Sequence, residues 1–221
     1  MSGARQLLLP FPEDFLGSPT DFVPAASNEA ALAWLAREAD WPDRRLAIWG
    51  EEGCGKTHLL RAWVRRTGAA MQPGPALRGL PGRLPPAGIA IDDADAVPAE
   101  ETLLHWLNAA RDAGVPVLLT SRIAPARLPV RLPDLASRLR AILAVEIGRA
   151  EDELLRLLLA RLLAERQWRL DPGFQDWLLP QLPRTPASLR EMVARLDRLL
   201  LAEGGRITQR LVRDVLPGLA D

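Results

Sequence analysis

The chain has little cysteine, no long apolar run and no net charge, and each of these features excludes a class of protein. One cysteine among 221 residues rules out an internal disulfide. The N-terminus has no charged segment followed by a hydrophobic signal core, and no apolar run reaches the roughly 18 residues of a membrane span. We therefore expect a protein of the reducing cytosol without a membrane span. Basic and acidic residues number 28 each, so no overall positive field holds nucleic acid, and any such contact must be local.

A glycine-rich stretch carries the strongest signal in the chain. The short apolar run 46–49 is typical of a buried strand, and residues 50–57 fit the pattern G-x-x-x-x-G-K-[ST]. Glycines permit a tight turn whose N–H groups point at one anion, and the helix that follows adds its positive N-terminal dipole. We predict a phosphate-binding loop in which Lys56 supplies charge and Thr57 holds magnesium. The nucleotide contacts assigned to this stretch are Gly50, Glu51, Glu52, Gly53, Cys54, Gly55, Lys56, Thr57 and His58.

Two of these residues are open to a plainer interpretation. Cys54 reads as a small loop residue rather than a reactive thiol, although a helix N-terminus lowers a thiol's pKa. His58 reads as a partly exposed helix residue rather than a metal ligand, because no second His or Cys lies nearby in the sequence.

A second buried strand over residues 88–91 ends in two carboxylates. In a phosphate-loop protein such a strand runs beside the first one, which brings Asp92 to the magnesium shell. Asp93 is then placed to orient or activate a water. The alternative is an ordinary acidic turn after a strand.

A third strand is expected over residues 115–119, after a helix over 101–113. It leads into Thr120 and Ser121, whose hydroxyls are placed to touch a γ-phosphate or the attacking water. This placement follows the rule that ligands bind at the carboxyl ends of parallel strands.

Arg138 lies on a short helical segment, 133–139, before a strand expected over 141–147. Arginine stabilises charge on a transferring phosphoryl group and can be supplied to a neighbour's nucleotide. Arg131 and Arg140 remain alternatives for this role, and each of the three also reads as a solvated surface charge.

The chain divides into three parts. Residues 1–20 are expected to form an extended tail, 21–148 a nucleotide-binding α/β core and 149–221 a lid made only of helices. The tail peptide comprises Gln6, Leu7, Leu8, Leu9, Pro10 and Phe11. It either lies in an apolar groove of another protein or covers the chain's own core. In the lid, Arg190 lies opposite an apolar helix row and either reaches the phosphates or is solvated.

Taken in order, these motifs resemble the DnaA family of AAA+ proteins, over roughly residues 5–218. The closer likeness is to the Hda-type regulators of that family, which lack its DNA-binding domain. The resemblance implies a P-loop parallel sheet flanked by helices, a C-terminal helical lid, and bound ADP or ATP with Mg²⁺. It equates residues 50–57 with Walker A, Asp92 and Asp93 with Walker B, and Thr120 or Ser121 with sensor 1.

The resemblance also assigns residues that composition does not. Arg138 takes the arginine-finger position and Arg190 falls at sensor 2. Phe22, Val23 and Asn28 fall where the family holds adenine. The peptide Gln6–Phe11 is similar to the sliding-clamp-binding peptide of the Hda-type regulators.

The function implied is regulatory inactivation of DnaA, a negative control of replication initiation. The tail docks on the DNA-loaded sliding clamp of DNA polymerase III, Arg138 enters the ATP site of a DnaA subunit, and hydrolysis leaves ADP–DnaA. DNA is then contacted through the clamp, AAA+ self-association remains open, and little ATPase is expected of the chain alone. The alternative is an origin-DNA-binding or loading ATPase with its own cycle. The absence of a helix-turn-helix after the lid, and the short interval between Lys56 and Asp92, count against it.

Overall fold

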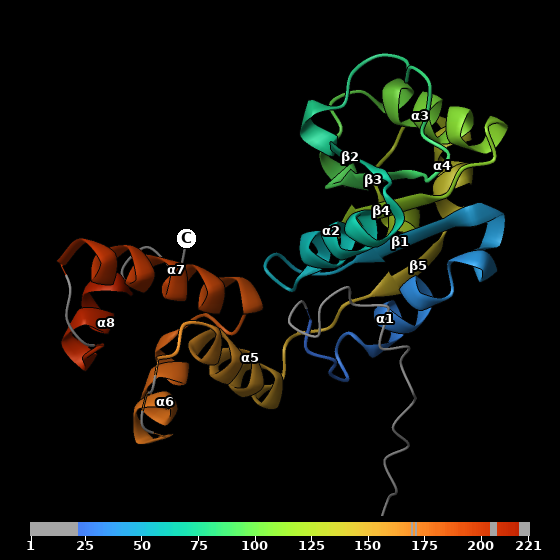
Figure 1. Cartoon of the computed structure of the whole chain (residues 1–221). Helices are drawn as coiled ribbons and strands as arrows, with labels where there is room; N and C mark the ends of the chain where they lie inside the picture. Colours follow the sequence, from blue (N-terminus) through green and yellow to red (C-terminus); the bar gives the residue numbers. More distant parts are fainter. Residues whose placement is uncertain (1–21, 169, 171, 204–206, 217–221) are drawn as a thin grey trace, which may run out of the picture.

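The computed structural model describes residues 22–168, 170, 172–203 and 207–216. At its centre lies a five-stranded sheet in the order β2-β3-β4-β1-β5, with every neighbouring pair parallel. The strands are β1 Arg45–Trp49, β2 Ala70–Pro73, β3 Ile89–Asp92, β4 Val117–Ser121 and β5 Leu143–Glu146. The predicted tail, including Gln6–Phe11, lies outside the described residues. The parallel sheet with flanking helices confirms the predicted fold class (Figure 1).

Helices cover both faces of the sheet. They are α1 Glu29–Ala36, α2 Lys56–Thr67, α3 Glu100–Asp112 and α4 Pro133–Ala141. Because side chains alternate along a strand, Leu46 and Ile48 of β1 pack with α1 and α2, whereas Ala47 packs with α3 and α4 on the other face. Burial on both faces explains the near-continuous apolar sequences of β1 and β4.

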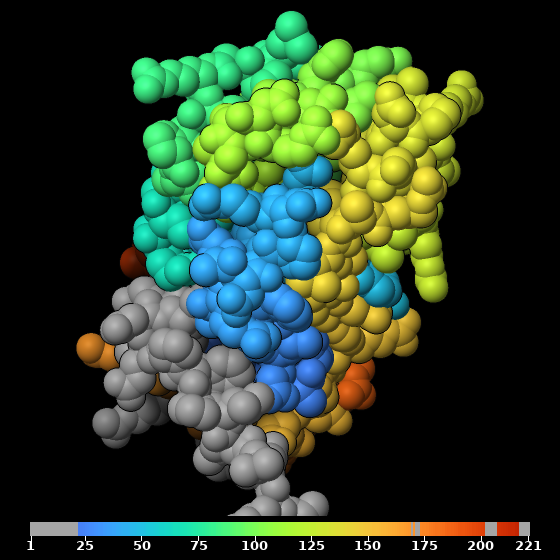
Figure 2. All heavy atoms as spheres, turned by 90° about the vertical axis from the view of Figure 1, so that its right-hand side faces the viewer, coloured from blue at the N-terminus to red at the C-terminus, as the bar shows by residue number. Residues whose placement is uncertain are grey.

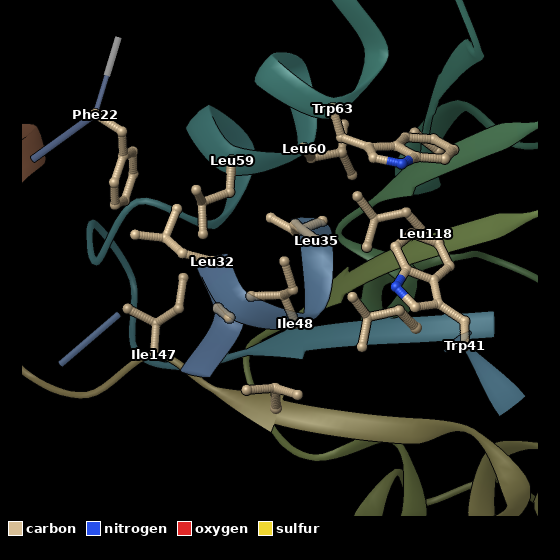
Figure 3. Packing of buried hydrophobic residues seen from close by; sticks show 14 of the residues in the cluster. Phe22, Leu32, Leu35, Trp41, Ile48, Leu59, Leu60, Trp63, Leu118 and Ile147 are labelled. Carbon is tan, nitrogen blue, oxygen red and sulfur yellow. The ribbon is translucent and has the colours of Figure 1, made fainter. Parts of the chain in front are cut away.

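The core beneath α1 and α2 is dense in leucine and tryptophan. Leu32 and Leu35 meet Leu59, Leu60 and Trp63 of α2 above Ile48 (Figure 3). The indole of Trp41 stacks on that of Trp63 at a centroid distance of 5.7 Å. This layer fixes the position of α2, and so the position of the glycine-rich loop that precedes it.

The remaining helices form the lid around a hydrophobic cluster of their own. They are α5 Asp152–Glu165, α6 Pro172–Leu178, α7 Pro186–Glu203 and α8 Gln209–Val215. In Figure 1 they lie together on the side of the sheet toward which the loop between β1 and α2 points. None of the helices in the described ranges is long and apolar enough to cross a membrane.

Several element boundaries lie one or two residues from the sequence-based prediction. The strand expected over 115–119 runs over Val117–Ser121 instead, because Val115 still belongs to the turn that ends α3, where its N–H donates to Ala110 O at 3.0 Å. The first helix, α1, ends at Ala36 and is followed by a 3₁₀ turn over Glu38–Asp40. The first shift places Thr120 and Ser121 inside a buried strand.

Candidate functional site

The loop between β1 and α2 wraps around the ammonium group of Lys56. Lys56 Nζ donates to Gly50 O at 2.8 Å and to Glu51 O at 2.9 Å. Lys56 is also the first residue of α2, a 12-residue helix, so its charge lies at the positive end of the helix dipole. Gly53 has a φ of +77°, a left-handed conformation that glycine adopts without strain. The arrangement concentrates positive potential inside the loop.

A cavity of about 410 Å³ opens beside this loop. It lies between the loop and the start of α7, and four cationic side chains reach it: Lys56 and Arg61 from α2, Arg190 from α7 and Arg122 from the end of β4. Its lining residues are Glu52, Gly53, Gly55, Lys56, Thr57, His58, Arg61, Asp93, Arg122, Ala187 and Arg190. So many cations around one cavity suit a polyanion better than an apolar ligand.

Two hydroxyls converge on the carboxylate at the end of β3. Asp92 Oδ1 accepts from Thr57 Oγ1 at 3.1 Å and from Thr120 Oγ1 at 2.6 Å. Among the described residues, no group of three His, Cys, Asp or Glu side chains is placed to hold a metal by itself. Thr57 and Asp92 offer the hard oxygen atoms that Mg²⁺ prefers, and the ion takes its other ligands from phosphates and water in such sites. The pair therefore fits a nucleotide-dependent magnesium ion.

Asp93 lies next to this pair and faces the cavity. Burial raises the pKa of its carboxyl, and the charges of Asp92 and Asp95 raise it further. Its backbone φ of +53° is left-handed, which is uncommon for a residue with a side chain. Its N–H donates to Thr120 Oγ1 at 2.9 Å. A carboxylate held in this way is suited to orienting a water.

The predicted phosphate contacts of Thr120 and Ser121 stay predictions. Both side chains are fully buried and neither lines the cavity. Ser121 Oγ donates to Ile123 O at 2.6 Å. In this arrangement Thr120 contacts the site indirectly, through its hydrogen bonds to Asp92 and Asp93.

The residues assigned to adenine lie in the segment 22–28, which precedes α1 and forms a strap between core and lid. Phe22 and Val23 line a second cavity of about 350 Å³, which shares His58 and Arg190 with the first. The Phe22 ring stacks on His58 at 5.5 Å. Asn28 directly precedes α1 but makes no side-chain capping bond: its Oδ1 accepts from Ala25 N and its Nδ2 donates to Val23 O, both at 3.0 Å. Asn28 thus braces the strap.

The lid touches the glycine-rich loop directly. Ala187 N, in the first turn of α7, donates to Gly53 O at 3.3 Å. One turn further, Arg190 lines both cavities. The position of the lid helix is therefore coupled to the conformation of the loop.

The other loop residues are held by exposed arginines or by burial. Arg149 binds Glu51 at 2.8 Å and lowers the pKa of that carboxyl, and Arg122 pairs with Glu52 at 3.3 Å. Burial raises the pKa of the Cys54 thiol, so Cys54 is a small packing residue here and not an activated thiolate.

Arg138 lies on α4, away from both cavities. Its Nε is buried without a hydrogen-bond partner among the described residues. Burial lowers the pKa of Arg45 on β1, and the nearby charge of Arg138 lowers it further. Glu100 accepts from the N–H groups of Arg131 and Leu132 and holds the start of α4. The arginine-finger assignment stays a prediction.

Sequence reasoning missed three residues that line the first cavity. Arg61 follows Thr57 by one helical turn, so the spacing that puts both on one face of α2 was visible in the sequence. Arg122 directly follows the last residue of β4, where the strand-end rule also applies. Ala187 gave no signal, because it reaches the cavity only through the docking of the lid.

Comparison with known proteins finds likenesses in fold to solved structures. The sequence matches no protein-family model. An uncharacterized protein of Haemophilus influenzae is 27% identical over 187 residues, which cover 76% of this chain and 80% of that protein. Domain III of the Thermotoga maritima replication initiation protein DnaA superposes with a TM-score of 0.72 at 18% identity, covering 94% of this chain and 98% of that chain.

Two further structures share the architecture. AMPPCP-bound DnaA from Aquifex aeolicus has a TM-score of 0.65 at 20% identity, covering 91% of this chain and 72% of that chain. The Thermotoga maritima RuvB Holliday junction branch migration motor has a TM-score of 0.58 at 17% identity, covering 78% and 60%. These likenesses show the fold, which is that of DnaA domain III, with the lid included in the match.

Proposed function

We propose that the protein binds ADP or ATP with Mg²⁺ between the glycine-rich loop and the lid. The carrying observation is the cavity in which Lys56 and Thr57 on one side face Arg190 on the other. The phosphates lie against the loop N–H groups and Lys56, and the base lies toward the strap at Phe22 and Val23. That solved DnaA from Aquifex aeolicus binds AMPPCP supports this choice of ligand.

Each residue around the phosphates has a distinct task in this proposal. Thr57 and Asp92 would hold magnesium, which would supply positive charge to the outer phosphates. Asp93 orients water, and Arg190 neutralises phosphate charge from the lid. Arg61 and Arg122 add positive potential at the cavity rim.

The same proposal assigns the protein a regulatory role toward DnaA in the cytoplasm. The tail peptide Gln6–Phe11 docks on the sliding clamp, and Arg138 enters the ATP site of a DnaA subunit, so that DnaA-bound ATP is hydrolysed. Support comes from the DnaA-like fold and from the place of Arg138 on α4, outside the two cavities described above.

The test is hydrolysis of DnaA-bound ATP in the presence of this protein, clamp and DNA, with each component omitted in turn. We expect hydrolysis to need all of them. A finger supplied in trans is worth roughly 10³ to 10⁵ in rate, so Arg138→Ala should abolish the stimulation and leave nucleotide affinity intact. Arg140→Ala, on the same helix, is the matched control. If only Arg140→Ala loses the stimulation, Arg140 is the arginine finger. If both variants stimulate fully, neither arginine is the finger and the proposed regulatory mechanism is refuted.

A second candidate is a DNA-binding or loading ATPase with its own cycle, and one observation favours it. No aspartate or glutamate lies between Glu52 and Asp92, whereas this stretch exposes Arg61, Arg65, Arg66, Arg78 and Arg83. The segment that carries these arginines, teal to green, runs up the left edge of the face in Figure 2. This candidate predicts clamp-independent DNA binding that weakens steeply with salt. Steady ATP hydrolysis by the chain alone would also favour it.

A further inference from the structure

The turn that follows β2 packs against the turn that follows β3. In the parallel pair, Pro73 lies opposite Asp92, and both strands then enter 3₁₀ turns, Gly74–Ala76 and Ala94–Ala96 (Figure 1). Gly74 is buried at this contact. A Cβ on Gly74 would lie 2.1 Å from Asp93 O and 2.8 Å from Asp92 O, both of them backbone atoms. Only glycine permits this approach.

The turn at Asp92 and Asp93 is held from its other side as well. The Thr120 hydroxyl accepts from Asp93 N and donates to Asp92 Oδ1. Asp93 adopts a left-handed conformation that costs free energy in a residue with a side chain and persists only where the surroundings impose it. Gly74 and Thr120 contact this turn from its two sides.

We propose that Gly74 is a positioning residue of the nucleotide site, which with Thr120 clamps the Asp92–Asp93 turn so that its carboxylates meet magnesium and water. This inference rests on the proposed nucleotide function. An added methyl group has to displace the turn by about 1 Å, and a misplacement of that size costs on the order of 10²-fold in comparable sites. Gly74 itself touches neither nucleotide nor metal in this scheme.

The experiment measures ATP affinity by calorimetry in Mg²⁺ and in EDTA, for the full chain. The wild type should bind more tightly in Mg²⁺. Gly74→Ala should lose about tenfold or more of that magnesium-dependent gain, as outer-shell variants of metal sites do, and keep its affinity in EDTA within about twofold. Gly82→Ala is the matched control, since it lies in the same β2–β3 connection and its Cβ would meet no atom within 4 Å. A merely structural defect would weaken binding in both buffers.

A second variant keeps the test decisive where Gly74→Ala does not fold. Thr120→Val removes the hydroxyl from the other side of the turn without adding bulk, and it should lose the same magnesium-dependent gain. The inference is overturned when a folded Gly74→Ala, or Thr120→Val, keeps the full gain. If the wild type binds no nucleotide, the proposed function is overturned together with this inference. The titration of the wild type alone distinguishes that outcome from a failure of the inference about Gly74.

Discussion

The contact of the lid with Gly53 predicts that a substitution there has two effects, one on stability and one on nucleotide binding, which can be measured separately. Gly53 and Gly68 have left-handed φ angles of +77° and +76°. Alanine in that conformation costs about 1–2 kcal/mol, so both Gly53→Ala and Gly68→Ala should lower the melting temperature, by about 2–8 °C in a chain of this size. A Cβ at Gly68 would meet no atom within 4 Å, so Gly68→Ala reports the backbone strain alone.

Gly53→Ala should in addition weaken nucleotide binding. Its Cβ would lie 3.1 Å from Thr185 and 3.3 Å from Ala187, so the methyl group pushes the start of α7, and Arg190 with it, away from the loop. Hydrogen bonds to charged groups are worth about 1.5–3 kcal/mol, which corresponds to roughly tenfold to a hundredfold in affinity. Calorimetry with ATP and Mg²⁺ measures the loss, and Gly68→Ala should bind as the wild type does.

A double-mutant cycle separates the lid from a direct effect on the loop. If Gly53→Ala acts by displacing Arg190, then adding Arg190→Ala should cost little more than either change alone. Free-energy losses that add in full would show that Gly53 acts on the phosphates without Arg190. Wild-type affinity in Gly53→Ala would refute the coupling of lid and loop altogether.

The remaining predictions concern Asp93 and the lid core. Burial raises the folded-state pKa of Asp93 above its ordinary 3.8, so ionisation costs the folded state stability as pH rises through that raised value. Asp93→Asn should therefore be more stable than the wild type at neutral pH. In thermal melts this gap in stability should narrow as pH falls through the raised pKa toward the ordinary 3.8, and a gap independent of pH would contradict this. In α5, the fully buried Leu159→Ala should lower the free energy of unfolding by about 2–5 kcal/mol. Leu157→Ala, which is 51% exposed, should cost less than about 0.5 kcal/mol by denaturant titration, and equal losses would place the lid core elsewhere.

The sequence was most informative where function is local along the chain. The glycine-rich loop needs a strand, a turn and a helix in succession, and residues 46–60 carry all three signals. The convergence of Asp92 on Thr57 could be predicted because parallel strands bring their carboxyl ends to one edge of a sheet. The lid helices could be predicted from their caps and apolar periodicity.

Contacts between distant segments could not be predicted in this way. Asn28 has the sequence of a helix cap, yet its side chain bonds the strap at Val23, because tertiary contacts hold that strap against the lid. The hydrogen bond from the Thr120 hydroxyl to Asp92 was not predicted either, because it depends on how β3 and β4 lie side by side in the sheet. Gly74 gave no signal at all, since its role depends on a close approach between two turns that only the folded sheet creates.

The most direct measurement is a calorimetric titration of the full chain with ATP and with ADP in Mg²⁺, beside Lys56→Met. Lys56 Nζ lies within the loop, hydrogen-bonded to Gly50 O and Glu51 O, where we propose that the phosphates bind. We predict saturable binding of one nucleotide per chain that Lys56→Met loses while remaining folded. A wild type that binds neither nucleotide at millimolar concentration, or a Lys56→Met variant that binds equally well, would contradict the account.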